Sequence, residues 1–251
     1  MTIATQKRRE LAWIRETQSY GEIPPGNLTD SEAPDALLIS ETTTIGIEVT
    51  EYVRGRGAMG GSKLRAIEND AWKFARDAQT LFGCGSDLPL FVTFGWNGHL
   101  LPRGKPERDA IVSEMVDTIR KHVPQEEMSA LPIPEWQLWS GPLHRYVHSI
   151  FVMKQWAGSY PHWAPCESGA VGCTPTEIQS CIDEKQLKLW NYRANCDQVY
   201  LLIVAEGSHV STHPGDTTEV REHFYRSGFD RVLFLDRVQR HVAPLNFEVT
   251  P

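Results

Sequence analysis

The chain has 251 residues, 41% of them hydrophobic, which is enough to bury a sizeable core in one large domain or two small ones. The charged opening segment has no apolar run behind it, and no long uncharged apolar stretch follows. We therefore expect a soluble cytoplasmic protein with no membrane contact. The formal net charge of −7 gives no support to nucleic-acid binding by the molecule as a whole, so such binding must depend on local basic patches.

Helix-like and strand-like segments alternate along the chain. Amphipathic spacing and capping residues indicate the helices, and short runs rich in Ile, Val, Leu and Thr indicate the strands. The expected elements are a helix over 7–20, a hairpin of strands over 35–40 and 44–50, a helix over 62–82, a strand over 88–96, a helix over 106–122, a strand over 144–156, a helix from 174 or 176 to 192, a strand over 199–206, a helix over 217–228 and a strand over 229–236. The strand over 88–96 follows a helical crossover, so we expect it to pair in parallel with an earlier strand.

This alternation predicts an α/β fold with a mixed central sheet flanked by helices. We expect one elaborated domain over residues 1–251. Residues 99–175 contain proline-rich and irregular segments, and they are expected to form a long insertion.

Two carboxylates stand in the predicted hairpin. If the chain turns around residues 41–43, Asp35 lies opposite residue 48 or 49, which makes the side chains of Asp35 and Glu48 cross-strand neighbours. Two carboxylates that close repel each other unless a cation lies between them. Magnesium takes one or two carboxylates with waters and phosphate oxygens, so the pair predicts a metal site. The alternative left open is a pair of strand-end charges that face water.

The stretch PDALLISETTTIGIEVTEY resembles the core motif of the PD-(D/E)XK nuclease superfamily, which has the restriction-endonuclease-like fold. Pro34 and Asp35 match its first part, and Glu48, Val49 and Thr50 match the (D/E)-x-K part. The order of helix, hairpin, helix and strand over residues 7–98 is similar to the family core, and residues 181–207 and 229–236 resemble its distal helix and strands.

The resemblance implies metal-dependent hydrolysis of phosphodiester bonds in nucleic acid, with DNA as the expected substrate. The implied cofactor is Mg²⁺, with Mn²⁺ as a substitute, and the implied ligands are Asp35 and Glu48. The family also implies a glutamate from the opening helix. Glu10 and Glu16 are both available there, and Glu10 is preferred because it shares a helix face with Ile14 and follows the basic run KRR.

The sequence departs from the family pattern at Thr50, which stands where a lysine is normal. A threonine hydroxyl can position a water molecule but supplies no positive charge. The replacement lysine is left open among four candidates on later helices: Lys63, Lys73, Lys185 and Lys188.

Four cations follow the Glu48 strand within a glycine-rich segment: Arg54, Arg56, Lys63 and Arg65. Such a segment can bring cations and backbone N–H groups to phosphates, so these residues are candidates for nucleic-acid binding. A solvated flexible loop is the equal alternative.

Tryptophans gather further along the chain, at positions 136, 139, 156 and 163. We expect them to build a local core, the alternative being stacking on unpaired bases.

A second function is kept open because of Thr50 and the negative net charge. In that case the chain is a catalytically inactive module of the nuclease fold that binds nucleic acid or a protein partner in a defence or repair assembly. Whether it acts alone, as a homodimer or within a larger assembly is not decided by the sequence.

Overall fold

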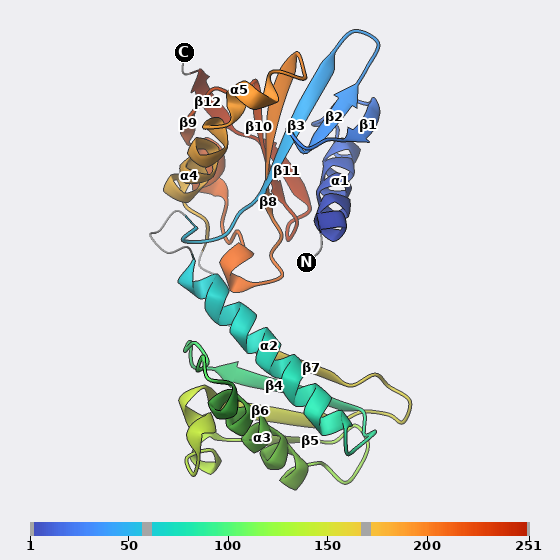
Figure 1. Cartoon of the computed structure of the whole chain (residues 1–251), viewed down its shortest axis with the longest axis vertical. Coiled ribbons are helices and arrows are strands. Elements are labelled where there is room, and N and C mark those ends of the chain that lie inside the picture. Colours follow the sequence, from blue (N-terminus) through green and yellow to red (C-terminus); the bar gives the residue numbers. More distant parts are fainter. Residues whose placement is uncertain (1–2, 57–61, 167–171, 250–251) are drawn as a thin grey trace. The chain divides into compact units, whose positions relative to one another are not determined.

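The computed structural model describes residues 3–56, 62–166 and 172–249 (Figure 1). The chain divides into two compact units, one formed by residues 1–62 with 169–251 and the other by residues 63–168. We call the first the split unit and the second the inserted unit, because the second interrupts the first in the sequence. None of the helices in the described part of the chain combines the length and apolar composition that crossing a membrane requires.

A six-stranded mixed sheet forms the centre of the split unit. Its strands in spatial order are β1 (Asn27–Asp30), β2 (Ala36–Ile39), β3 (Thr44–Glu51), β8 (Gln198–Ala205), β10 (Arg231–Asp236) and β11 (His241–Pro244). The strands β1, β2 and β3 are antiparallel neighbours, β3, β8 and β10 are parallel, and β11 is antiparallel to β10. A separate pair of parallel strands joins β9 (Phe224–Ser227) to β12 (Asn246–Val249). The predicted α/β class with a mixed sheet is confirmed.

Helices cover both faces of the six-stranded sheet (Figure 1). They are α1 (Ile3–Ser19), α4 (Pro175–Gln186), the short α5 (Leu189–Tyr192) and α6 (Thr218–Glu222), with a 3₁₀ turn η3 (Val210–Thr212). Helix α1 packs through Ile14 on the face that contains Leu202, and α4 packs through Ile182 on the face that contains Ile203. Both faces of β8 are therefore buried, which explains its continuous apolar sequence.

Helix α4 begins at a complete capping box. The Thr174 side chain accepts a hydrogen bond from the backbone N–H of Glu177, and the Glu177 carboxylate accepts one from the backbone N–H of Thr174. Pro175 occupies the first helical position, where it costs no hydrogen bond. The sequence therefore fixes where α4 begins, with Thr174 rather than Thr176 as the cap.

The inserted unit has its own four-stranded sheet and its own core. Its elements are α2 (Lys63–Gly83), β4 (Leu90–Trp96), α3 (Lys105–Lys121), β5 (Ala130–Ile133), η1 (Glu135–Gln137), η2 (Pro142–Arg145), β6 (Val147–Lys154) and β7 (His162–Cys166), with strand order β5-β6-β4-β7. Phe74 of α2 and Met115 of α3 are fully buried with Phe94 of β4 in one cluster. The two helices thus share a hydrophobic core with the sheet.

The prediction for residues 88–96 was wrong in its pairing. Strand β4 pairs antiparallel with β6 and parallel with the later strand β7, within the inserted unit. The prediction assumed that all strands of the chain belong to one sheet. Helix α2 instead packs its apolar face on the separate sheet that contains β4. Consequently residues 63–98 lie outside the sheet of the hairpin, and the inserted unit spans 63–168 where an insertion over 99–175 was expected.

The predicted helix over 217–228 is also shorter than expected. Helix α6 ends at Glu222, and residues 224–227 form β9. These residues pair with β12 near the end of the chain, a partner that local periodicity does not reveal.

Candidate functional site

The site lies where β3 extends beyond its neighbour β2. The last residue pair between the two strands joins Ala36 to Ile47, whereas β3 stays paired with β8 as far as Glu51. Residues 48–51 therefore have a strand partner on one side only. The predicted register is confirmed, because Ala36 opposite Ile47 places Asp35 next to Glu48.

A hollow of about 310 Å³ opens beside this part of β3. Five segments line it: Gln6, Arg9, Glu10 and Trp13 of α1, Asp35 before β2, Val49, Thr50 and Glu51 of β3, Arg56 of the following loop, and Lys185 of α4. Three of the predicted site residues line the hollow, namely Glu10, Asp35 and Thr50, together with one predicted phosphate contact, Arg56.

Asp35 takes the place of a strand partner for β3. Its Oδ2 accepts a hydrogen bond of 2.8 Å from the backbone N–H of Val49, and its Oδ1 lies 3.8 Å from the Nζ of Lys7. Burial raises the pKa of Asp35 to about 6, and the charge of Glu48 acts in the same direction. The two carboxylates are therefore close enough to repel each other.

Glu48 is almost fully buried, with 5% of its surface exposed. Its Oε1 lies 2.6 Å from the Nζ of Lys185, and its carboxylate also accepts a hydrogen bond from Tyr192. Burial and the neighbouring Glu48 raise the pKa of the Tyr192 hydroxyl, so it remains a donor. A buried carboxylate requires such partners, because an unpaired charge away from water is costly.

The structure separates the four lysine candidates. Lys185 contacts Glu48, whereas Lys188 is exposed to solvent and no ion pair of it exists within the described residues. Lys63 and Lys73 belong to α2 of the inserted unit. Of these four candidates, Lys185 is thus the one that contacts the carboxylate pair.

The acidic residue chosen from the opening helix is also in the hollow. Glu10 has 6% of its surface exposed and accepts a 2.9 Å hydrogen bond from Gln6. Burial raises its pKa, with a smaller contribution from the charge of Asp35. The alternative, Glu16, accepts a 2.9 Å hydrogen bond from Arg237 and does not line the hollow.

Thr50 is buried beneath a cation. The Nη1 of Arg56 donates to the Thr50 hydroxyl at 3.0 Å and to the carbonyl of Glu51 at 3.2 Å, while its Nη2 lies 3.2 Å from Glu184. The guanidinium of Arg56 thus contacts the hydroxyl of Thr50 directly.

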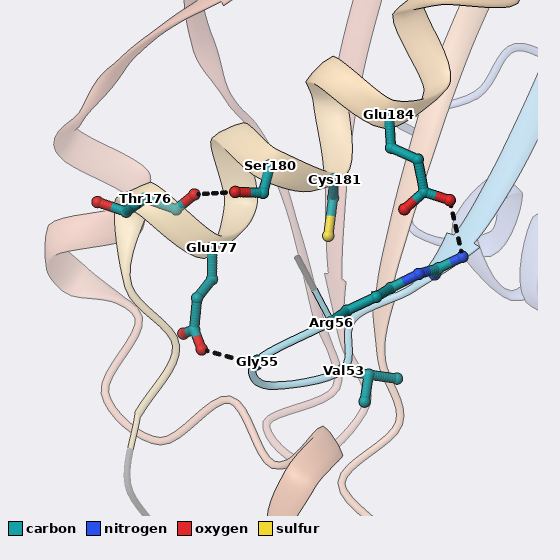
Figure 2. A pocket seen from close by; sticks show the side chains of 8 residues that line it. All are labelled: Val53, Gly55, Arg56, Thr176, Glu177, Ser180, Cys181 and Glu184. Atoms are coloured by element: carbon teal, nitrogen blue, oxygen red, sulfur yellow. Dashed lines mark hydrogen bonds and ion pairs between the residues drawn. The ribbon is translucent and has the colours of Figure 1, made fainter. Parts of the chain in front are cut away.

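A smaller pocket of about 140 Å³ lies between the 53–56 loop and α4 (Figure 2). Glu177 holds the loop by accepting hydrogen bonds from the N–H of Gly55 at 3.2 Å and from the hydroxyl of Tyr52 at 2.9 Å. Cys181 faces this pocket, and burial raises the pKa of its thiol to about 11, so it is not a thiolate nucleophile near neutral pH. The contacts instead fix Arg56 over Thr50.

The remaining predicted phosphate contacts are divided between the units. The Arg54 guanidinium donates to the carbonyl of Gly172, and Arg65 lies 3.9 Å from Glu68 within α2. Lys63 is the exposed first residue of α2. Glycines 57, 60 and 61 of the predicted loop lie outside the described residues.

The donor set can be tested against the implied magnesium ion. Within residues 3–56, 62–166 and 172–249, no group of three or more His, Cys, Asp or Glu side chains is arranged to hold a metal. Asp35 and Glu48 remain as a mutually repelling pair of hard oxygen donors beside a polar hollow. This pair fits Mg²⁺ chemistry, because Mg²⁺ is commonly held by one or two carboxylates with water completing its shell.

The site therefore gathers acidic and basic side chains at one end of a hairpin. The acidic ones are Glu10, Asp35, Glu48 and Glu51, and the cations are Lys7, Arg9, Arg56 and Lys185. Sequence reasoning alone did not identify Lys7 or Arg9 as parts of it. Comparison with known proteins finds no matching family model, no matching curated protein and no matching solved structure.

Proposed function

We propose that the split unit is a metal-dependent phosphodiesterase that hydrolyses nucleic acid, with DNA as the expected substrate, through a PD-(D/E)XK-like site. The observation that carries the proposal is the ion pair of 2.6 Å between Lys185 and Glu48, next to Asp35. Lys185 thereby places next to the carboxylate pair a positive charge that Thr50 cannot supply.

The order of elements in the split unit also supports the proposal. Helix α1, the β2–β3 hairpin, helix α4 and strand β8 follow one another in the order that the resemblance implies. The inserted unit separates the hairpin from α4 in the sequence, so the second helix and strand of the core come from the distal half of the chain. Strand β8 is parallel to β3, which carries Glu48.

Each side chain has a definite role in this reaction. Asp35 and Glu48 would hold the Mg²⁺ ion, which when bound supplies Lewis acidity to a phosphoryl oxygen and lowers the pKa of a water molecule. Lys185 and Arg56 would stabilise the negative charge that develops on the phosphoryl oxygens. Thr50 would orient a water molecule through its hydroxyl, and Glu10 would accept a hydrogen bond or a proton from that water molecule.

A cleavage assay on fluorescently labelled DNA tests the proposal. Asp35→Asn and Glu48→Gln should each reduce Mg²⁺-dependent cleavage by about a thousandfold or more, since each removes a charged ligand while keeping the side-chain shape. Glu41→Gln is the matched control, because Glu41 is an exposed carboxylate in the turn of the same hairpin and should leave the rate unchanged. If both site variants cleave as fast as the wild type, the proposal fails.

A second candidate function is a non-catalytic module of the same fold that binds nucleic acid or a protein partner. One observation favours it: Glu48 and Asp35 already have partners in the chain, since Lys185 neutralises the first and the Val49 N–H bonds the second. Such a module would bind its partner without magnesium and would leave a phosphodiester substrate intact at any metal concentration.

A further inference from the structure

A groove of about 750 Å³ lies wholly within the inserted unit. Its walls come from the segment after β4, the first turns of α3 and the turn η2. Tyr146 and Ile111 provide buried apolar surface. The exposed ionisable side chains that line the groove are His99, His144, Arg145 and one carboxylate, Glu107. We call it the η2 groove.

The cations at the η2 groove have no ion-pair partner among the described residues. Arg145 is exposed, with its guanidinium 5.8 Å from the centre of the Tyr146 ring. Arg103 and Lys105 are exposed too, and they stand in the sequence between the lining residues Pro102 and Glu107. Within the part of the chain that the structure describes, none of these three cations has a carboxylate within ion-pair distance.

Other arginines of the same unit behave differently. Arg108 lies 3.5 Å from Asp70, and Arg120 lies 3.6 Å from Asp117. Unpaired cations around a hollow attract an anionic partner even in a protein of net negative charge, because the field in a cleft depends on the charges nearby.

Residues 142–146 form one wall of the groove, and the residues that precede them in the sequence carry two exposed tryptophans. Leu138 and Leu143 anchor this segment in the core, at 2% and 0% exposure. Trp136 and Trp139 are 62% and 63% exposed. The expectation of a local core is therefore wrong for these two and for Trp156, which is 60% exposed, whereas Trp163 is buried as expected.

Hydrogen bonds hold this wall in place. The backbone N–H of Leu143 donates to Glu114 of α3 at 2.9 Å, and the Asn97 side chain donates to the carbonyl of His144 at 3.0 Å. The tryptophans are thus presented on a segment that the chain itself fixes. Large exposed aromatic side chains on such a segment indicate an interaction surface.

We propose that the η2 groove binds single-stranded nucleic acid. Arg103, Lys105 and Arg145 would contact phosphates, and Trp136 and Trp139 would stack on bases. Cations beside exposed aromatic rings are the combination that single strands require, because only unpaired bases offer their faces to a side chain. The proposal goes beyond hydrolysis in the split unit, since binding here needs no metal ion.

Fluorescence anisotropy of a labelled 20-nucleotide single strand, titrated with the full-length protein in EDTA, tests the proposal. Trp139→Ala should weaken binding about tenfold through lost stacking. Arg145→Ala should weaken it about fivefold and reduce the slope of log affinity against log salt by about one. Lys121→Ala is the matched control, because it removes an exposed cation from the other end of α3, about 24 Å from Lys105, and should change nothing.

Three results would overturn the proposal: no binding of the strand, binding that Arg145→Ala and Trp139→Ala leave unchanged, or an equal loss in Lys121→Ala. Tighter binding of a duplex of the same sequence would also overturn it, because paired bases cannot stack on the tryptophans. Since EDTA prevents metal-dependent cleavage, the outcome is independent of the cleavage assay. If the wild-type protein binds the single strand but does not cleave DNA in the presence of Mg²⁺, only the proposed hydrolysis is rejected.

Discussion

The two units of this protein differ in whether the charged side chains of their candidate sites have ion-pair partners. In the split unit, the buried carboxylate of Glu48 has an ion-pair partner in Lys185. In the inserted unit, Arg145 and Lys105 are exposed and have no ion pair within the described residues, and Trp136 and Trp139 are exposed as well. Burial explains the difference, because only a buried charge must be compensated for the chain to fold.

The comparison separates two kinds of functional surface. The hollow at β3 is organised before any ligand arrives, as a site for chemistry requires. The η2 groove offers charges and rings that gain their interactions only when a partner binds. Substitutions at the two surfaces can test this contrast.

Lys185→Met should lower the free energy of unfolding by about 3 kcal/mol, because it leaves the carboxylate of Glu48 buried without its cation. Urea unfolding at pH 7.5 measures the change. Lys188→Met is the matched control on an exposed lysine nearby and should change stability by less than about 0.5 kcal/mol. Equal effects of the two substitutions would remove the contrast between buried and exposed charges.

Asp35→Asn should stabilise the metal-free protein above pH 6, by about 2 kcal/mol. The pKa of Asp35 is raised from 3.8 to about 6 in the folded chain, so the folded state holds its proton more tightly than the unfolded state does. Ionisation therefore costs stability as the pH rises from about 4 to 6, and the cost is complete above that range. Asparagine avoids it and keeps an acceptor for the Val49 N–H.

Thermal unfolding of both proteins between pH 4 and 8 in EDTA measures this effect. The two melting curves should coincide near pH 4 and separate as the pH rises. Magnesium should stabilise the wild type above pH 6 and have less effect below it, because protons then compete for Asp35. A gap between the proteins that is the same at every pH would contradict the assigned origin of the pKa shift.

Arg56→Ala should reduce DNA cleavage about tenfold, because it removes the cation that contacts Thr50 while leaving Lys185 in place. Initial rates with Mg²⁺ in excess measure the change. Arg226→Ala, an exposed arginine of β9, serves as the control. An unchanged rate would show that Lys185 alone supplies the positive charge.

Arg145→Ala should change the free energy of unfolding by less than about 0.5 kcal/mol, because this side chain has no ion pair to lose within the described residues. Its effect should appear only in nucleic-acid binding. A loss of stability above about 1 kcal/mol would mean that Arg145 supports the fold, and the contrast with Lys185 would weaken.

The parts of the account that follow from local sequence were predictable. The register of the β2–β3 hairpin depends on a short turn, so the approach of Asp35 to Glu48 could be read from the spacing. Glu10 could be preferred over Glu16 from its helix face and its basic neighbours. The cap at Thr174 follows from the Thr-x-x-Glu pattern.

The remaining parts depend on contacts between distant residues. Lys185 and Glu48 are 137 positions apart, and only the packing of α4 on the sheet selects this lysine among four. The sequence of β4 is equally compatible with pairing to the hairpin and with a second sheet, so the predicted pairing was wrong. Composition likewise does not show whether Trp139 is buried, because that depends on which neighbours anchor its segment.

Calorimetric titration of Mn²⁺ into the protein at pH 7.5 shows whether Asp35 and Glu48 hold a metal ion. We expect saturable binding in the wild type and in Glu41→Gln, and loss of that binding in Glu48→Gln, with protons released as the buffer approaches pH 6. A wild-type protein that gives no binding heat, or a Glu48→Gln variant that binds as well as the wild type, would contradict the claim that Asp35 and Glu48 form a metal site.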